Sequence, residues 1–387
     1  MQPANLMFDS SHKSSVGLIS PDLTIVEMDP WKDPRWEAFV LRHSQTTVYH
    51  HPAWLAALQR EYRQAALYLA CEDQDGFLRG VFPLLYTRGL PFGGGPLTGP
   101  RLASLPRTPL AGPLALDPAA LSALLREAQR RASARPSVRL QIKTEESDLA
   151  DGVEGISRKA WRQTYIVPLA GVVGQPYQIP GSQNRSSIKR AINKAIASGV
   201  HARTAESEDE LRAWYRLYLE TMRRNMVPAR PYRFFQALWQ LMRPKGLMRL
   251  LLAEQQTEKG PRIIGGHIFF AFGSTVTYAF GASGADDFGL RPNDIIMGQA
   301  INDASQAGYR SVDLGEVPQG DDNLARFKTK WGAEPVRLYR YYSPDFPDDP
   351  QASDEPEPSL VVLAKKVWTA LPLGVTSWLG DRIYAYL

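Results

Sequence analysis

The order of the expected helices and strands constrains this chain more than any single motif does. Between residues 182 and 343, hydrophobic periodicity predicts a helix, a strand, two helices, a three-stranded antiparallel meander, a helix, a strand, a helix and a strand. A coarser form of this plan, with a strand, helices, a strand pair, a helix and strands, occupies the first half. The order excludes a parallel doubly wound sheet. It favours a mixed α/β fold that is duplicated without a detectable sequence repeat.

Local signals support several of these elements. The helix expected over 117–134 begins with Asp117 as N-cap and Pro118 in its first turn, and the helix expected over 182–199 ends at a glycine. The stretch 89–113 is dense in glycine and proline, so we expect a long loop there. Its glycine-rich part lacks the lysine and the strand–loop–helix setting of a phosphate loop.

Length and composition fit a two-domain protein. The chain has 387 residues, of which 44% are hydrophobic and 22% charged, as is typical of soluble globular proteins. The single cysteine, Cys71, fits a reducing compartment, and the N-terminus lacks the apolar segment of a secretory signal, so we expect a cytoplasmic location. The expected divisions are a disordered tail (1–20), a first domain (21–175), a second domain (176–343), an acidic proline-rich linker (344–358) and C-terminal amphipathic helices (359–387).

The C-terminal segment is amphipathic and is interrupted by Pro372, which predicts two short helices. We expect these helices to pack against the first domain. A peripheral contact with the inner membrane face is the alternative, because Trp378 and Tyr384 are residue types found at membrane interfaces.

Charge is distributed unevenly along the chain. The net charge is +5, yet residues 155–205 hold eight Lys or Arg and no acidic residue. In the helix expected over 182–199, an apolar stripe is predicted to pack on a sheet, and it comprises Ile188, Ala191, Ile192, Ala195 and Ile196. Arg185 and Lys189 lie near the N-terminus of this helix, where a phosphate would bind well. A solvated helix face is the other reading of this basic zone.

Most familiar catalytic signatures are absent. The sequence has neither the lysine-containing phosphate loop nor the G-x-S-x-G elbow of α/β-hydrolases. The pair His50-His51 has no carboxylate or cysteine at metal-ligand spacing, so we expect it to begin a helix rather than to bind a metal. An exposed role for one of these histidines is the alternative.

The segment 311–332 combines a strand, an irregular loop and the start of a helix. Asp313 and Glu316 lie near the strand end, and Lys328 follows across the loop. A carboxylate can take a proton from an amine nucleophile, and a cation can stabilise an oxyanion. These residues therefore permit acyl transfer, although a turn-capping aspartate and solvated lysines would give the same pattern.

The stretch NLARFKTKWGAEP, residues 323–335, places three cations around two aromatic residues. Phe327 and Trp331 are four residues apart, so we expect them to share one helical face toward a core. Lys328 points away from that face and could reach a cleft. Lys330 is expected to be a solvated charge at the rim.

This stretch and its continuation, NLARFKTKWGAEPVRLYRYY, resemble the C-terminal signature of the Fem (FemABX) peptidoglycan-bridge transferases and their CelD-like relatives. Further stretches match in the same order, namely VYHHPAWLAAL, LASLPRTPLAGPLAL, SQNRSSIKRAINKAIASGV and TYAFGASGADDFGLRPNDIIMGQAINDASQAGYRSVDLG. The resemblance covers residues 23–342. It implies two acetyltransferase-like (GNAT) domains in tandem around a central cleft, with Lys328 stabilising developing negative charge and Arg185 and Lys189 near an anionic substrate group.

The resemblance implies acyl transfer to an amine, with two classes of donor. In the Fem branch the donor is an aminoacyl-tRNA and the acceptor a peptidoglycan-precursor peptide, whereas an acyl-CoA donor is presumed in the CelD-like branch. This chain lacks the long coiled-coil arm of tRNA-using Fem enzymes. The stretch GADDFGLRPNDIIMG (284–298) also lacks the R/Q-x-x-G-x-G/A spacing with which GNAT domains bind the pyrophosphate of CoA.

We therefore expect an acyltransferase that moves an acyl or aminoacyl group to an amine of a cell-envelope precursor, either a peptidoglycan peptide or a lipid-linked or exopolysaccharide sugar. The alternatives are an acyl-CoA-dependent N-acetyltransferase in exopolysaccharide biosynthesis and a non-catalytic module that binds RNA or another anionic ligand. The expected partners are an anionic cell-wall or sugar-nucleotide precursor and an aminoacyl-tRNA or acyl-CoA donor, with no DNA, no metal and no permanently bound cofactor. The candidate catalytic residues are Lys328 and Asp313, and the candidate substrate-binding residues are Arg185, Lys189, Tyr278, Ser283, Asn293, Arg326, His50 and Trp54.

Overall fold

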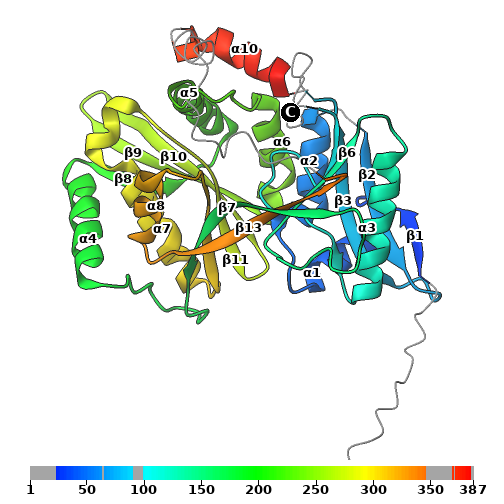
Figure 1. Cartoon of the computed structure of the whole chain (residues 1–387). Coiled ribbons are helices and arrows are strands. Elements are labelled where there is room, and N and C mark those ends of the chain that lie inside the picture. Colours follow the sequence, from blue (N-terminus) through cyan, green and yellow to red (C-terminus); the bar gives the residue numbers. More distant parts are fainter. Residues whose placement is uncertain (1–22, 63–64, 90–98, 346–367, 370, 385–387) are drawn as a thin grey trace, which may run out of the picture.

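The computed structural model describes residues 23–62, 65–89, 99–345, 368–369 and 371–384 (Figure 1). The expected N-terminal tail, the glycine-rich part of the long loop and most of the acidic linker lie outside these residues, as does most of the first expected C-terminal helix. Within the described residues, thirteen strands form one mixed sheet. Their order is β1-β2-β3-β4-β6-β13-β7-β12-β11-β10-β9-β8, and β5 pairs with β3.

Strands of both halves agree with the expected order. The first half holds β1 (Thr24–Glu27), β2 (Ala66–Glu72), β3 (Leu78–Thr87), β4 (Arg101–Ala103), β5 (Leu114–Ala115), β6 (Arg139–Thr144) and β7 (Ser157–Pro168). The second half holds β8 (Val200–Thr204), β9 (Met248–Thr257), β10 (Gly260–Phe272), β11 (Thr275–Ser283), β12 (Ser311–Val317) and β13 (Glu334–Ser343). The strands β9, β10 and β11 form the expected antiparallel meander.

Each half of the sheet is completed by a strand from the other half. β7 follows β6 along the chain but pairs antiparallel with β12, whereas β13 follows β12 and pairs antiparallel with β6. β7 and β13 also pair with each other, and Figure 1 shows them side by side across the middle of the molecule. This exchange joins the two halves through continuous backbone hydrogen bonds. The paired strands β7 and β13 therefore form one side of the region between the halves, which is called its floor below.

Helices cover the sheet at positions that the sequence signals predict. The first half has α1 (Pro34–Arg42), η1 (Val48–His50), α2 (Pro52–Tyr62) and α3 (Pro118–Ser133). The second half has α4 (Ser182–Ala197), α5 (Glu208–Arg224), α6 (Tyr232–Leu241), η2 (Arg243–Lys245), η3 (Ala285–Leu290), α7 (Pro292–Gln306) and α8 (Asp322–Thr329), and α10 (Leu373–Tyr384) follows. The Asp117 side chain accepts a hydrogen bond from the N–H of Ala120, which confirms the expected cap.

An aromatic core joins the two halves. The Trp54 ring on α2 packs edge-on against Phe234 on α6 and Phe270 on β10, with ring centroids 5.7 and 5.4 Å apart. All three rings are buried. Removing such a ring from water contributes about 2–3 kcal/mol, so these contacts help to fix the halves relative to each other.

Two details differ from the expected local structure. The short strand β4 lies within the stretch that was expected to be a loop. It forms because it pairs with β3 and β6, and no local pattern in the sequence predicts it. Ile196 is 59% exposed although it belongs to the predicted apolar stripe of α4. The buried face of α4 centres on Ile188 and Ala195, and the helix turns Ile196 toward solvent.

The C-terminal helix α10 packs on the second half, not on the first domain as expected. It lies across α5 in Figure 1, and Asp381 forms an ion pair with Arg233 of α6. Gly380 allows the close approach, since a Cβ atom there would lie 2.6 Å from the carbonyl oxygen of Ala229. Among the described helices, none combines the length and the apolar character needed to cross a bilayer.

Candidate active site between the two halves

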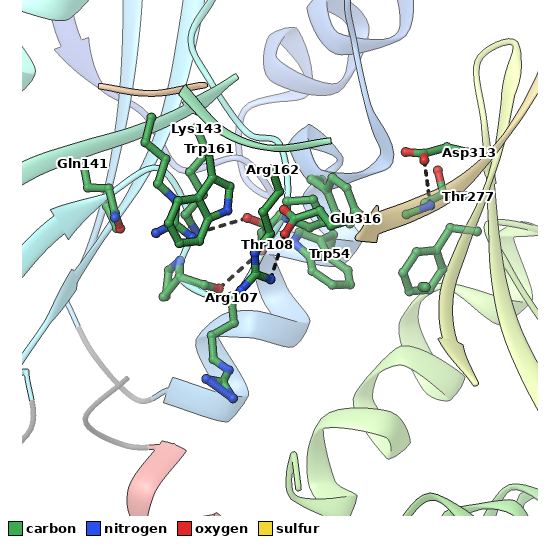
Figure 2. Close-up of a pocket in the computed structure, with 18 of the residues that line it drawn as sticks. Trp54, Arg107, Thr108, Gln141, Lys143, Trp161, Arg162, Thr277, Asp313 and Glu316 are labelled. Atoms are coloured by element: carbon green, nitrogen blue, oxygen red, sulfur yellow. Dashed lines mark hydrogen bonds and ion pairs between the residues drawn. The ribbon is translucent and has the colours of Figure 1, made fainter. Parts of the chain in front are cut away.

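A cavity of about 560 Å³ lies between the halves, on the floor formed by β7 and β13. Figure 2 shows Gln141 and Lys143 on one side, Asp313 and Thr277 on the other, and Arg162 with Glu316 between them. Both halves contribute to its lining, which consists of Tyr49, Trp54, Thr87, Arg101, Ala103, Pro106, Arg107, Thr108, Pro109, Gln141, Lys143, Trp161, Arg162, Phe270, Thr277, Tyr278, Ala279, Phe280, Asp313, Gly315, Glu316 and Arg340. The cavity thus has a carboxylate side on β12 and a cationic side on β4, β6 and β13 and the loop at Arg107.

A β-bulge in β12 brings both carboxylates to the cavity. Residues three apart on a regular strand point to opposite faces of a sheet. Here Asp313 pairs with Ile166 and Glu316 with Thr164, so β12 carries one extra residue against β7. Gly315 sits in the bulge with φ of 81°, a conformation that favours glycine. The bulge turns Asp313 and Glu316 toward the same space.

Lys328 of α8 holds this bulge from behind. Its Nζ donates to the carbonyl oxygens of Gly315, at 2.7 Å, and Glu316, at 3.0 Å. The residue is only 3% exposed and does not line the cavity. Burial lowers the pKa of Lys328 to about 8, while the Asp313 and Glu316 carboxylates oppose that shift. The sequence suggested an electrostatic role for this lysine in the reaction, and the structure places it where it fixes the backbone of the carboxylate-bearing strand.

Asp313 is the carboxylate best placed for proton transfer. Its Oδ1 accepts a hydrogen bond from the hydroxyl of Thr164, at 2.5 Å, and from the N–H of Gly315, at 2.8 Å. Its deep position raises the pKa of Asp313, and these hydrogen bonds reduce the shift. A carboxylate with a raised pKa is a stronger base than an ordinary aspartate, so Asp313 suits removal of a proton from an ammonium group.

The opposite side of the cavity gathers cations. Lys143 on β6 is buried and donates to the carbonyl oxygens of Leu105 and Thr108, at 2.9 and 3.0 Å. Burial and the neighbouring Arg340 lower the pKa of Lys143 well below its ordinary value, and burial also lowers the pKa of Arg340. Like charges this close repel each other, so an anionic group bound among them would stabilise all of them.

A buried ion pair supports the loop that carries this cationic side. Arg230, before α6, binds the Glu61 carboxylate at 3.0 Å and donates to the carbonyl oxygen of Arg107 at 2.6 Å. Arg107 and Leu105 both have positive φ, of 53° and 56°, which is unfavourable for side chains of their size. The cations Lys143 and Arg230 therefore hold a strained loop in place from two sides.

The structure separates the other predicted substrate-binding residues into two groups. Tyr278 and Trp54 line the cavity together with Asp313. His50 and Ser283 are buried and do not line it. The His50 ring contacts the Gly112 carbonyl oxygen at 2.9 Å, and burial lowers the pKa of His50 to about 4.

The remaining four predicted positions do not line the cavity. Arg185 and Lys189 are exposed on α4, and Arg326 is exposed on α8, where it bonds to Asn323. Asn293 shares a hydrogen bond with His267 at 3.1 Å. The geometry thus brings together four of the ten predicted side chains around the bulge, namely Asp313, Tyr278 and Trp54 in the cavity and Lys328 behind it.

Five cations of the cavity were not predicted from the sequence, namely Lys143, Arg340, Arg101, Arg107 and Arg162. Lys143 and Arg340 lie within expected strands, and a cation inside an apolar strand pattern is the signal that could have marked them. The sequence did not show that β13 crosses to β6, the pairing that sets Arg340 opposite Lys143 in register.

Lys330 also differs from its predicted role as a solvated rim charge. Its ammonium forms an ion pair with Asp294, which is buried in the first turn of α7. Asp287, just before this helix, pairs with Arg262. The N-terminus of α7 is where a GNAT domain would hold a CoA pyrophosphate, and here the chain's own carboxylates lie at that helix end.

Comparisons with known proteins agree with this architecture. Residues 182–329 match the family model of the acetyltransferase (GNAT) domain. No curated protein shows significant sequence similarity to the chain. The domain match confirms the expected enzyme class, an acyltransferase.

Several solved structures share the fold over most of the chain. FemX has a TM-score of 0.61 at 17% identity, covering 82% of this chain and 96% of that chain. The C-terminal domain assigned to a lysylphosphatidylglycerol synthetase from Agrobacterium fabrum has 0.53 at 13%, covering 82% and 93%. A tandem GNAT protein from the clavulanic acid biosynthesis pathway has 0.50 at 11%, covering 84% and 100%. These similarities confirm the expected mixed α/β fold of two GNAT-like halves.

Proposed function

We propose that this protein transfers an acyl or aminoacyl group to the amine of a cell-envelope precursor, and that it belongs with the Fem and CelD-like enzymes. The observation that carries the proposal is the pair Asp313 and Glu316, turned by one bulge into a cavity whose opposite side is cationic. The shared fold with FemX and with the synthetase domain supports a substrate of the cell envelope.

In the proposed reaction, the amine nitrogen attacks the carbonyl carbon of the donor. A C–N bond forms, the C–S or C–O bond to the leaving group breaks, and the electron pair leaves with that sulfur or oxygen. Asp313 accepts the proton that the ammonium must lose before it attacks. The leaving group carries negative charge or phosphates, which Arg101, Arg107 and Arg340 would stabilise from the cationic side.

The cavity favours an anionic donor on its cationic side. The cations Arg101, Arg107, Lys143 and Arg340 lie on that side, whereas carboxylates lie at the N-terminus of α7. This arrangement fits the phosphates of an acyl-CoA or the 3′ end of an aminoacyl-tRNA. The match to an acetyltransferase domain favours acyl-CoA as the donor. N-acetylation of an exopolysaccharide sugar is therefore the second candidate function.

The test is the Asp313→Asn variant, assayed by mass spectrometry with acetyl-CoA or an aminoacyl-tRNA as donor and with peptidoglycan peptides or amino sugars as acceptors. We expect the rate of transfer to fall by about 10²–10⁴. In the wild type, activity should decline with falling pH as Asp313 is protonated, at a higher pH than for an ordinary aspartate because the pKa of Asp313 is raised.

The matched control is Asp286→Asn, an exposed aspartate on η3 that does not line the cavity. It should keep wild-type activity. Full activity of the Asp313→Asn enzyme with every donor and acceptor pair would refute the assignment of the base.

A further inference from the structure

The helix α10 docks through small residues and leaves large apolar residues outside. Thr376 is buried, and four residues later Gly380 packs closely on Ala229, so these two positions mark the face that contacts the protein. Val375 and Trp378, in contrast, are 40% and 57% exposed. A surface helix ordinarily does the reverse, with large apolar residues toward the core and polar residues toward water. α10 therefore carries an apolar surface that the described part of the chain leaves in contact with solvent.

The exposed residues follow one stripe of the helix. Val375, Trp378 and Arg382 are three and four residues apart, so they lie one after another along the same face, which is called the outer face of α10 below. The Arg382 guanidinium lies over the Trp378 ring, 5.2 Å from its centroid. Tryptophan rings and arginines are both characteristic of helices that lie at the boundary between lipid headgroups and acyl chains.

The apolar surface continues beside the helix. Met226 and Val227 are exposed and precede Ala229, on which Gly380 packs. A stable dimer interface buries about 800 Å² on each partner, from roughly 20–30 residues. Four partly exposed side chains fall short of that requirement, whereas a lipid surface needs only a few inserted side chains and an attraction for its headgroups. The small extent of the surface favours a bilayer over a second copy of the chain.

Arginines flank this surface at both ends of α10. Arg223, in the last turn of α5, donates to the carbonyl oxygen of Leu371 just before α10, at 3.2 Å. Arg382 lies in the last turn of α10 itself. Arg224 lies over the exposed Phe288 ring of η3, 5.0 Å from its centroid. Within the described residues, these guanidiniums contact rings, a hydroxyl and carbonyl oxygens, so no carboxylate neutralises them there.

The balance of charge over these elements is positive. Asp381 is paired with Arg233, and Asp287 with Arg262. Outside these two pairs, residues 220–224, 285–291 and 373–384 carry four arginines and two carboxylates, namely Arg223, Arg224, Arg291, Arg382, Glu220 and Asp286. Positive charge beside an apolar surface is attracted to anionic headgroups, and each cation near such a membrane strengthens binding about fivefold.

We propose that the outer face of α10, together with Met226 and Val227, binds the surface of an anionic lipid bilayer. Val375 and Trp378 insert among the headgroups, and the arginines at the two ends of the helix contact lipid phosphates. The helix stays docked on the protein through its packed face, so binding requires no rearrangement of the fold. The inference stands apart from the proposed reaction, because none of these residues lines the cavity between the halves.

The test measures binding of the full chain to lipid vesicles by flotation. Vesicles of phosphatidylcholine are compared with vesicles of an equimolar mixture of phosphatidylcholine and phosphatidylglycerol. We expect the protein to bind the anionic vesicles at low salt, and to bind the neutral vesicles at least about tenfold more weakly. High salt should release the protein from the anionic vesicles, because ions screen the arginines.

The decisive variant is the double substitution Val375→Ser and Trp378→Ser. Both side chains are exposed, so its circular dichroism and urea unfolding should match the wild type, while its binding to anionic vesicles falls at least about tenfold. The matched control is Leu41→Ser with Phe77→Ser, which replaces two exposed apolar residues of the first half and should bind like the wild type. The helix α1, which carries Leu41, lies far from α10 (Figure 1).

Three outcomes would overturn the inference: no binding of the wild-type protein to anionic vesicles, undiminished binding by the double variant, or an equal loss in the control. Sedimentation equilibrium without lipid tests the other occupant. A wild-type dimer that the double variant converts to monomers, with no vesicle binding, would assign the surface to a second copy of the chain and overturn the membrane assignment. None of these measurements depends on whether the protein transfers an acyl group, so the proposed reaction can fail while the membrane surface stands, and the reverse.

Discussion

Lys328→Met removes one ammonium and keeps the length and most of the volume of the side chain. The two carbonyl oxygens at the bulge lose charge-assisted hydrogen bonds, each of which contributes about 1.5–3 kcal/mol. The change also removes a buried charge. Lowering the pKa of Lys328 from 10.5 to about 8 corresponds to roughly 3 kcal/mol of unfavourable free energy at neutral pH. The two effects partly cancel, and we expect a net loss of about 1–3 kcal/mol in the free energy of unfolding.

Activity should suffer more than stability. The bulge sets the positions of Asp313 and Glu316, and a displacement of about 1 Å in a catalytic group can lower a rate about 100-fold. We therefore expect the variant to remain folded at room temperature, as judged by urea denaturation, while its transfer rate falls about 100-fold.

Lys330→Met is the matched control, because it makes the same change two residues along the chain. Lys330 pairs with the buried Asp294 and not with the bulge, so this variant should lose stability and keep its rate per folded molecule. Wild-type turnover in Lys328→Met, or an equal loss in both variants, would refute the role of Lys328 in positioning the carboxylates.

The pH dependence of stability gives an independent check. In the unfolded chain Lys328 keeps its proton up to about pH 10.5, whereas the folded protein releases it from about pH 8, the lowered pKa of this group. Between these values the unfolded state binds more protons, so raising the pH stabilises the wild-type fold. Lys328→Met lacks this contribution. The stability of the wild type relative to the variant should therefore increase by up to roughly 3 kcal/mol from below pH 8 to pH 10.5.

Two further substitutions test the supports of the cavity. Glu61→Ala leaves the Arg230 guanidinium buried without this carboxylate. The substitution should lower the free energy of unfolding by about 3–5 kcal/mol, as measured by urea titration. A loss below about 1 kcal/mol would show that the ion pair does not support the Arg107 loop. Gly315→Ala places a Cβ in ordinary contact, 3.5 Å from the Tyr278 carbonyl oxygen, so its cost comes from the backbone at φ of 81° and should be about 1–2 kcal/mol. The transfer rate of this variant should fall as well. An unchanged rate in a destabilised protein would show that the bulge does not position the catalytic groups.

Periodicity and caps determined most of the elements. The meander, the capped helix α3 and the helices α4, α5 and α6 follow from local patterns of apolar residues and, for α3, from the N-cap Asp117. Asp313 and Lys328 could also be chosen from sequence, since a carboxylate at a strand end and a lysine in a recognisable motif are local signals. The predicted domain boundaries remain predictions.

What the sequence alone predicted, then, is the mixed α/β order, the duplication and four residues around the bulge, namely Asp313, Lys328, Tyr278 and Trp54. Only the tertiary structure decided the exchange of β7 and β13, the position of Lys143 against the loop at Leu105, and the pairing that brings Arg340 opposite Lys143. These features depend on contacts between segments far apart in the chain, such as the backbone pairing of Tyr342 with Gln141. Hydrophobic periodicity indicates which face of a helix or strand is buried, but not which other helix or strand covers that face. The cavity is formed by partners of that kind, and so its cationic side was visible only once the two halves were placed together.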